Sequence, residues 1–78
     1  MNTIDRQIEE LTRLKRGYEA KASRHEDQAE RLQFEDRSTL EARRHVQLAA
    51  ENREKASILQ QEIDKLSLEK AKLSTPSP

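Results

Sequence analysis

Residues 32–42 read LQFEDRSTLEA, and this stretch decides the fold of the chain. On its N-terminal side, apolar or small residues recur at alternating steps of four and three, which is the spacing of a coiled-coil seam. On its C-terminal side a second seam begins at Ala42, in a shifted phase. Leu32 and His45 are 13 residues apart, one short of two full heptads. One continuous helix would therefore turn its seam away from its partner here.

The same stretch contains a signal for the start of a helix. Ser38-Thr39-Leu40-Glu41 fits a capping box, in which the side chains of Ser38 and Glu41 each accept a hydrogen bond from the other's backbone amide. We therefore predict an all-α fold with two helices, over about residues 3–34 and 39–73. The alternative is one long coiled-coil helix, which the phase shift disfavours.

Two helices of similar length joined by a short connection lie antiparallel, so we expect an antiparallel coiled-coil hairpin. In this pairing Tyr18 lies opposite Ala56, and each of the two histidines lies opposite an alanine. Large side chains meeting small ones is what close packing needs. The predicted seam core consists of Ile4, Ile8, Leu11, Tyr18, Leu32, Leu59, Ile63, Leu66 and Leu73.

The composition excludes several classes of protein. Among 78 residues, 15 are basic and 15 acidic, none is cysteine, and 32% are hydrophobic. No apolar run exceeds the three residues Leu48–Ala50, so we expect no membrane span, no signal peptide and a cytoplasmic location. Residues 1–73 are predicted to form one hairpin domain. Residues 74–78, STPSP, are predicted to be a disordered tail, because proline cannot continue a helix.

No group of residues in the sequence has the pattern of an active site. There is no cysteine and no glycine-rich phosphate loop, and two helices enclose no cavity for a small-molecule substrate. His25 and His45 are only two possible metal ligands, where a site needs three or four. We therefore predict no enzyme, no cofactor and no metal. The histidines are interpreted as packed seam residues, with a pH-sensitive joint as the alternative.

Several apolar residues lie outside the seam and are candidates for binding a partner. Leu14, Gly17, Ile58 and Leu48 gather on one flank of the predicted hairpin, and Gly17 would let another helix approach closely. Phe34 and Leu40 would form a separate patch beside the turn. Scattered apolar residues on a surface are also normal and need no partner. However, a hairpin with one thin seam is marginally stable, so we expect self-association or another protein as partner.

These features predict a non-enzymatic protein–protein interaction module, such as an adaptor, co-chaperone or assembly factor that presents helix faces. In shape, length and lack of cysteine, the chain resembles the small hairpin co-chaperones of type III secretion needle subunits, a resemblance that carries over no residue roles. The alternative is a helical-bundle regulator that binds RNA or DNA. Its arginines would be Arg24, Arg31, Arg37, Arg43 and Arg44, near the turn. Between residues 20 and 50, six acidic residues balance six basic ones, so we do not expect nucleic acid as the partner.

Overall fold

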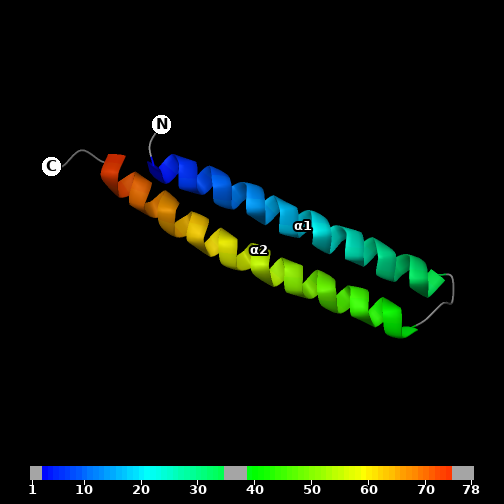
Figure 1. Ribbon diagram of the computed structural model, residues 1–78. Helices are drawn as coiled ribbons and strands as arrows, with labels where there is room; N and C mark the ends of the chain where they lie inside the picture. Colours follow the sequence, from blue (N-terminus) through cyan, green and yellow to red (C-terminus); the bar gives the residue numbers. More distant parts are fainter. Residues whose placement is uncertain (1–2, 35–38, 75–78) are drawn as a thin grey trace.

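The computed structural model describes residues 3–34 and 39–74, and these residues form two α-helices. Helix α1 spans Thr3–Phe34 and helix α2 spans Thr39–Ser74. The helices pack side by side and antiparallel, so that the start of α1 lies beside the end of α2 (Figure 1). The predicted helical hairpin is confirmed, and the described ranges contain no strand. The alternative of one long helix is wrong.

The ends of both helices agree with their sequences. Asp5 lies in the first turn of α1 and Arg31 in its last turn, where each charge opposes the helix dipole. Helix α2 ends at Ser74, one residue beyond the predicted boundary and two residues before a proline in the sequence. The rest of the predicted tail, residues 75–78, lies outside the described residues, as does Ser38 of the predicted capping box.

The core between the helices is built mainly from alanine. The buried hydrophobic residues are Ala22, Ala29, Ala42, Ala49, Ala56 and Ile63, all of them at seam positions. Apart from Ile63, the larger residues of the seam core are only half-buried, and these are Ile4, Ile8, Leu11, Tyr18, Leu32, Leu59 and Leu66. Alanine lets the helices approach closely, but its small side chain buries little apolar area. Each CH₂ group removed from water stabilises the fold by only about 0.8 kcal/mol. The hairpin interface therefore stabilises the chain only weakly.

Leu73 lies outside the core, although the heptad pattern assigns it to the seam. Its side chain is 73% exposed. The antiparallel register places Leu73 level with residue 1, and α1 begins only at Thr3. Leu73 therefore has no helical turn of α1 opposite it. The seam core is corrected to end before this residue.

Three polar contacts between the helices are consistent with the antiparallel register. The ammonium of Lys70 lies 2.5 Å from a carboxylate oxygen of Asp5, near the ends where the chain begins and finishes. Lys15 donates a hydrogen bond to the side chain of Gln60. Nearer the turn, the guanidinium of Arg53 pairs with the carboxylate of Glu26. These contacts occur along most of the hairpin and link the two helices side by side.

Candidate protein-binding faces

The heptad positions of Leu14, Gly17 and Ile58 in the antiparallel hairpin place all three near the middle of one long side, which we call the Leu14 face. Leu14 and Ile58 are each 54% exposed. A Cβ atom added at Gly17 would meet no atom within 4 Å, so the surface above this glycine is open. Leu14 also lines a hollow with residues of both helices, namely Gln7, Glu10, Leu11, Glu62 and Leu66. The two helices therefore build this face together.

Two lysines border the Leu14 face on the side toward the turn. The Nζ of Lys21 in α1 lies 5.5 Å from the centroid of the Tyr18 ring, and the Nζ of Lys55 in α2 lies 5.6 Å from it. A cation within about 6 Å of an aromatic ring is attracted to its electron-rich face. Tyr18 thereby holds two lysines from different helices on one side of the hairpin. Leu48, predicted on the same flank, is half-buried.

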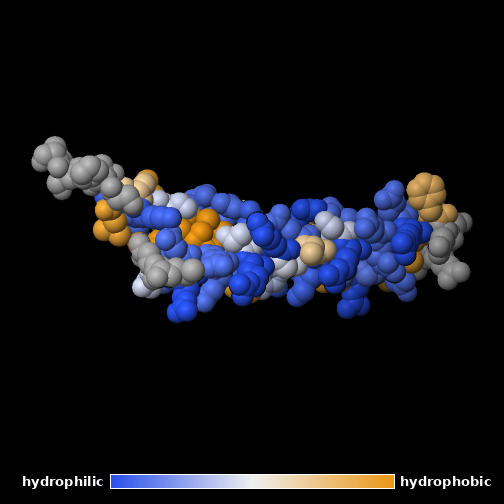
Figure 2. All heavy atoms as spheres, turned by 90° about the horizontal axis from the view of Figure 1, so that it is seen from above, coloured by the Kyte–Doolittle hydropathy of each residue, from blue (hydrophilic) through white to orange (hydrophobic). Residues whose placement is uncertain are grey.

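Phe34 and Leu40 do not form the single patch beside the turn that the sequence suggests. They are 84% and 78% exposed, and each lines a hollow built from its own helix alone. The hollow at Phe34 is lined by α1 residues, and the hollow at Leu40 by α2 residues. Both residues occupy the outward position of the heptad, which points away from the partner helix. They therefore lie on separate outer surfaces. On the face that Figure 2 shows, hydrophobic surface gathers toward the two ends of the rod, and the middle is mostly hydrophilic.

The structure brings the two histidines into direct contact, which the sequence pattern did not predict. The Nδ1 atoms of His25 and His45 are 2.9 Å apart, and the ring centroids are 5.1 Å apart. The histidines belong to neighbouring layers of the seam, about four residues or roughly 6 Å apart along the axis, and two imidazoles are long enough to span this offset. Two long side chains in neighbouring layers are the sequence signal for such a contact. No cluster of three potential metal ligands occurs among the described residues.

Asn52 is a further polar residue at a seam position, where a buried asparagine can select the register of a coiled coil. Its amide donates a hydrogen bond of 2.8 Å to the backbone oxygen of Leu48, one turn earlier in the same helix. This bond satisfies the amide within α2. The structure therefore gives Asn52 a partner that does not depend on the register of the two helices.

Sequence reasoning missed Val46, on the opposite long side of the hairpin. Val46 is 53% exposed and lines a shallow hollow over the alanine seam, together with Ala29, Ala49 and Ala50. The ion pair of Glu26 and Arg53 borders this hollow. An apolar residue directly beside a seam of small residues is the signal that could have found it, because small seam residues leave their flanks shallow.

The described arginines near the turn do not form a separate basic surface. Arg43 and Arg44 line the hollow at Leu40 together with Glu41, and Arg31 lines the hollow at Phe34 together with Asp27 and Glu30. Acidic neighbours reduce the field that a phosphate backbone would experience. The predicted cluster also includes Arg24 and Arg37, and Arg37 lies outside the described residues.

Neither described helix is long and apolar enough to cross a lipid bilayer. Comparison with known proteins finds no matching family, no matching curated protein and no matching solved structure.

Proposed function

We propose that this chain is a non-enzymatic protein–protein interaction module, of the kind found in adaptors, co-chaperones and assembly factors. It binds through the side of a helical hairpin. The observation that carries the proposal is the Leu14 face, where two half-exposed aliphatic side chains from different helices flank an open glycine.

The core of the hairpin is thin. Large side chains that could stabilise the hairpin are left partly in water, while the buried positions are mostly alanine. Complete burial of a large aliphatic side chain contributes about 1.5–3 kcal/mol. Leu14 and Ile58 are each about half exposed, so covering both in an interface would contribute about 1.5–3 kcal/mol in total, before the costs of association. A partner that covers this face therefore stabilises both the complex and the hairpin.

The dimensions of the molecule also support helix-face binding. The chain measures 64 × 20 × 13 Å along its principal axes, and its long sides are much larger than its ends. A helix from a partner can lie along such a side and contact both α1 and α2. The shallow hollow at Leu14, lined from both helices, provides the groove for its apolar side chains.

Capture from an extract of the source cells tests the proposal. Leu14→Glu with Ile58→Glu should retain helical circular dichroism, because neither side chain belongs to the buried core, and should lose the protein partner. The matched control is Leu40→Glu with Leu68→Glu, which replaces two exposed aliphatic residues of the outer side of α2. The control should bind as the parent does. Recovery of RNA or DNA in place of protein would contradict the proposal and favour the nucleic-acid alternative.

A further inference from the structure

The charged residues around the Leu14 face follow an order that reverses across its centre. On α1, Glu10 lies four residues before Leu14, and Lys21 lies four residues after Gly17. On α2, Lys55 lies three residues before Ile58, and Glu62 lies four residues after it. Since the helices are antiparallel, Glu10 and Glu62 share the end of the face toward the termini, while Lys21 and Lys55 share the end toward the turn.

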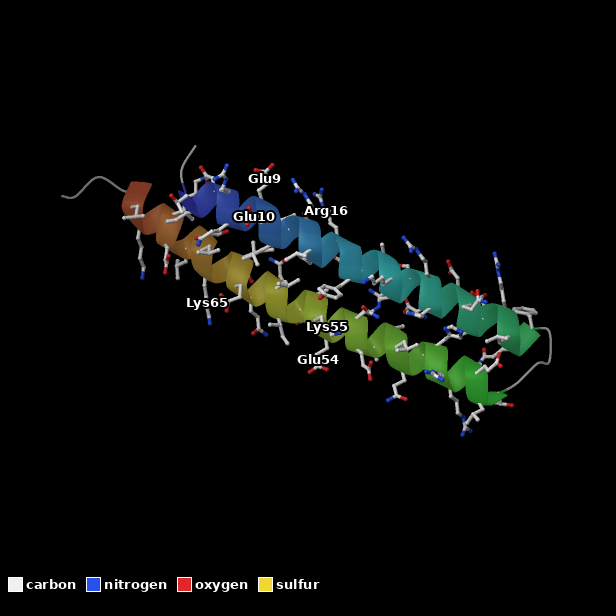
Figure 3. All side chains as sticks on the ribbon, viewed as in Figure 1. Glu9, Glu10, Arg16, Glu54, Lys55 and Lys65 are labelled. Carbon is white, nitrogen blue, oxygen red and sulfur yellow. The ribbon has the colours of Figure 1, made fainter. Side chains whose placement is uncertain are left out.

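The structure brings the members of each pair together, and their heptad positions place both pairs on the same side of the hairpin. Glu10 and Glu62 line the same hollow as Leu14, and Lys21 and Lys55 both lie over the ring of Tyr18. In Figure 3, Glu9 and Glu54 project from the outer edges of α1 and α2, whereas Glu10 and Lys55 lie over the ribbons between these edges. The Leu14 face therefore has an apolar centre between an acidic pair and a basic pair.

A second pair of charges on α2 also has opposite signs on the two sides of Ile58, in the opposite order to Lys55 and Glu62. Glu51 lies seven residues before Ile58 and Lys65 seven residues after it, and both are exposed. Seven residues are two helical turns, so both lie on the side of α2 that carries Ile58. Farther out, Arg44 and Lys72 lie fourteen residues from Ile58 and have the same sign. The reversed pattern is therefore confined to two turns on each side of the centre.

A surface whose charges reverse about its centre is complementary to itself. A two-fold axis that runs across both helices at the level of Ile58 would stack α1 on α1 and α2 on α2, antiparallel. Glu10 then faces Lys21 of the other copy, and Lys55 faces Glu62. Leu14 lies over the open surface of Gly17, and Ile58 lies close to the Ile58 of the other copy. An axis along the helices would instead bring Glu10 near Glu62 and Lys21 near Lys55, so like charges would meet.

The surface area of the chain is consistent with a covered face. The chain exposes 6460 Å², whereas a compact monomer of this mass exposes about 4,900 Å². The excess of roughly 1,500 Å² exceeds the ~800 Å² that each partner buries in a standard interface. Pairing through the Leu14 face would therefore leave each chain with a surface nearer to that of a compact protein.

We propose that the occupant of the Leu14 face is a second copy of this chain, packed face to face and antiparallel in a four-helix bundle. This inference rests on the proposed function and names its first partner. The two-fold axis passes near Ile58, and the contacts of Glu10 with Lys21 and of Glu62 with Lys55 select this arrangement.

Charge inversion combined with measurement of mass in solution tests the inference. The wild-type chain should have twice the 9.1 kDa mass of one chain. Glu10→Lys with Glu62→Lys makes both of these pairs basic, and Lys21→Glu with Lys55→Glu makes both acidic, so each variant alone should fall to the mass of one chain. An equal mixture of the two variants should recover the doubled mass, with one tagged and one untagged chain in each particle.

Matched controls separate a specific interface from a general effect of charge. Glu9→Lys with Glu54→Lys makes the same change of charge at the outer edges of the helices and should leave the doubled mass unchanged. Because the chain has no cysteine, Ile58→Cys should link two copies by a disulfide, whereas Leu68→Cys should not. The like-charge arrangement would place Ile58 against Leu14 of the other copy and would give no such link.

The outcomes of these experiments separate failure of the second-copy inference from failure of the proposed function. A wild-type chain with the mass of one chain, or a mixture that fails to recover the doubled mass, would overturn the second-copy inference. If such a monomer still bound a protein in a manner sensitive to Leu14→Glu with Ile58→Glu, the proposed function would stand without this inference. If the inverted variants stayed dimeric alone, the Leu14 face would not be the interface between copies.

Discussion

The Nδ1 atoms of His25 and His45 lie 2.9 Å apart across the seam, so one imidazole donates a hydrogen bond to the other. A ring that accepts this bond must have an unprotonated Nδ1. The contact joins the two helices through polar side chains in the alanine-rich part of the seam.

The depth of burial should separate two isoleucines that lie only five residues apart in α2. Ile63 is 9% exposed and Ile58 is 54% exposed. Ile63→Ala should destabilise the fold by about 2–5 kcal/mol, because it leaves a cavity in the seam. Ile58→Ala should retain the helical signal and weaken self-association. Urea unfolding followed by circular dichroism measures the first effect, and equal losses of folding stability in both variants would contradict the seam described here.

The ion pair between Glu26 and Arg53 should contribute little to stability. The hydrogen bond that Arg53 donates to Glu26, together with the negative charge of Glu26, raises the pKa of Arg53, but both side chains are about half exposed to water. Exposed ion pairs are typically worth about 0–1 kcal/mol. Arg53→Ala should therefore change the unfolding free energy by less than about 1 kcal/mol, measured in urea at moderate salt. A loss of several kcal/mol would show that this pair holds the helices together.

Gly17 should tolerate a methyl group but not a large side chain. Nothing lies within 4 Å of a Cβ placed there, and alanine is favoured over glycine in a helix by about 0.8–1 kcal/mol. Gly17→Ala should raise the melting temperature of the hairpin, because the helix gains propensity without a clash. Gly17→Leu should preserve the helical content but weaken association of two copies, since Leu14 of the other copy needs that space. Equal association of both variants would place Gly17 outside the interface.

Much of the architecture follows from local periodicity. The steps of four and three around Ile8 and Tyr18, the phase shift after Leu32 and the seam through Ala49 each depend on residues close together in the chain. A helix presents residues on one face according to their spacing alone. The two helices, their approximate ends and their antiparallel packing were therefore predictable.

The contacts between side chains were decided by the tertiary structure. The histidines were expected opposite alanines and instead contact each other, because the length of an imidazole spans the offset between layers. Phe34 and Leu40 are close in sequence, yet they line separate hollows because each points outward from a different helix.

By itself, the sequence determined which residues share a helix face, because spacing along a helix is a local property of the chain. Only the packed hairpin decided which side chains of the two helices come together. Glu10 and Glu62 are 52 residues apart in sequence and line one hollow, while Lys21 and Lys55 lie over one tyrosine ring. The physical reason is that the axial register between two helices and the reach of their side chains set these contacts, and neither is encoded in the periodicity of a single helix.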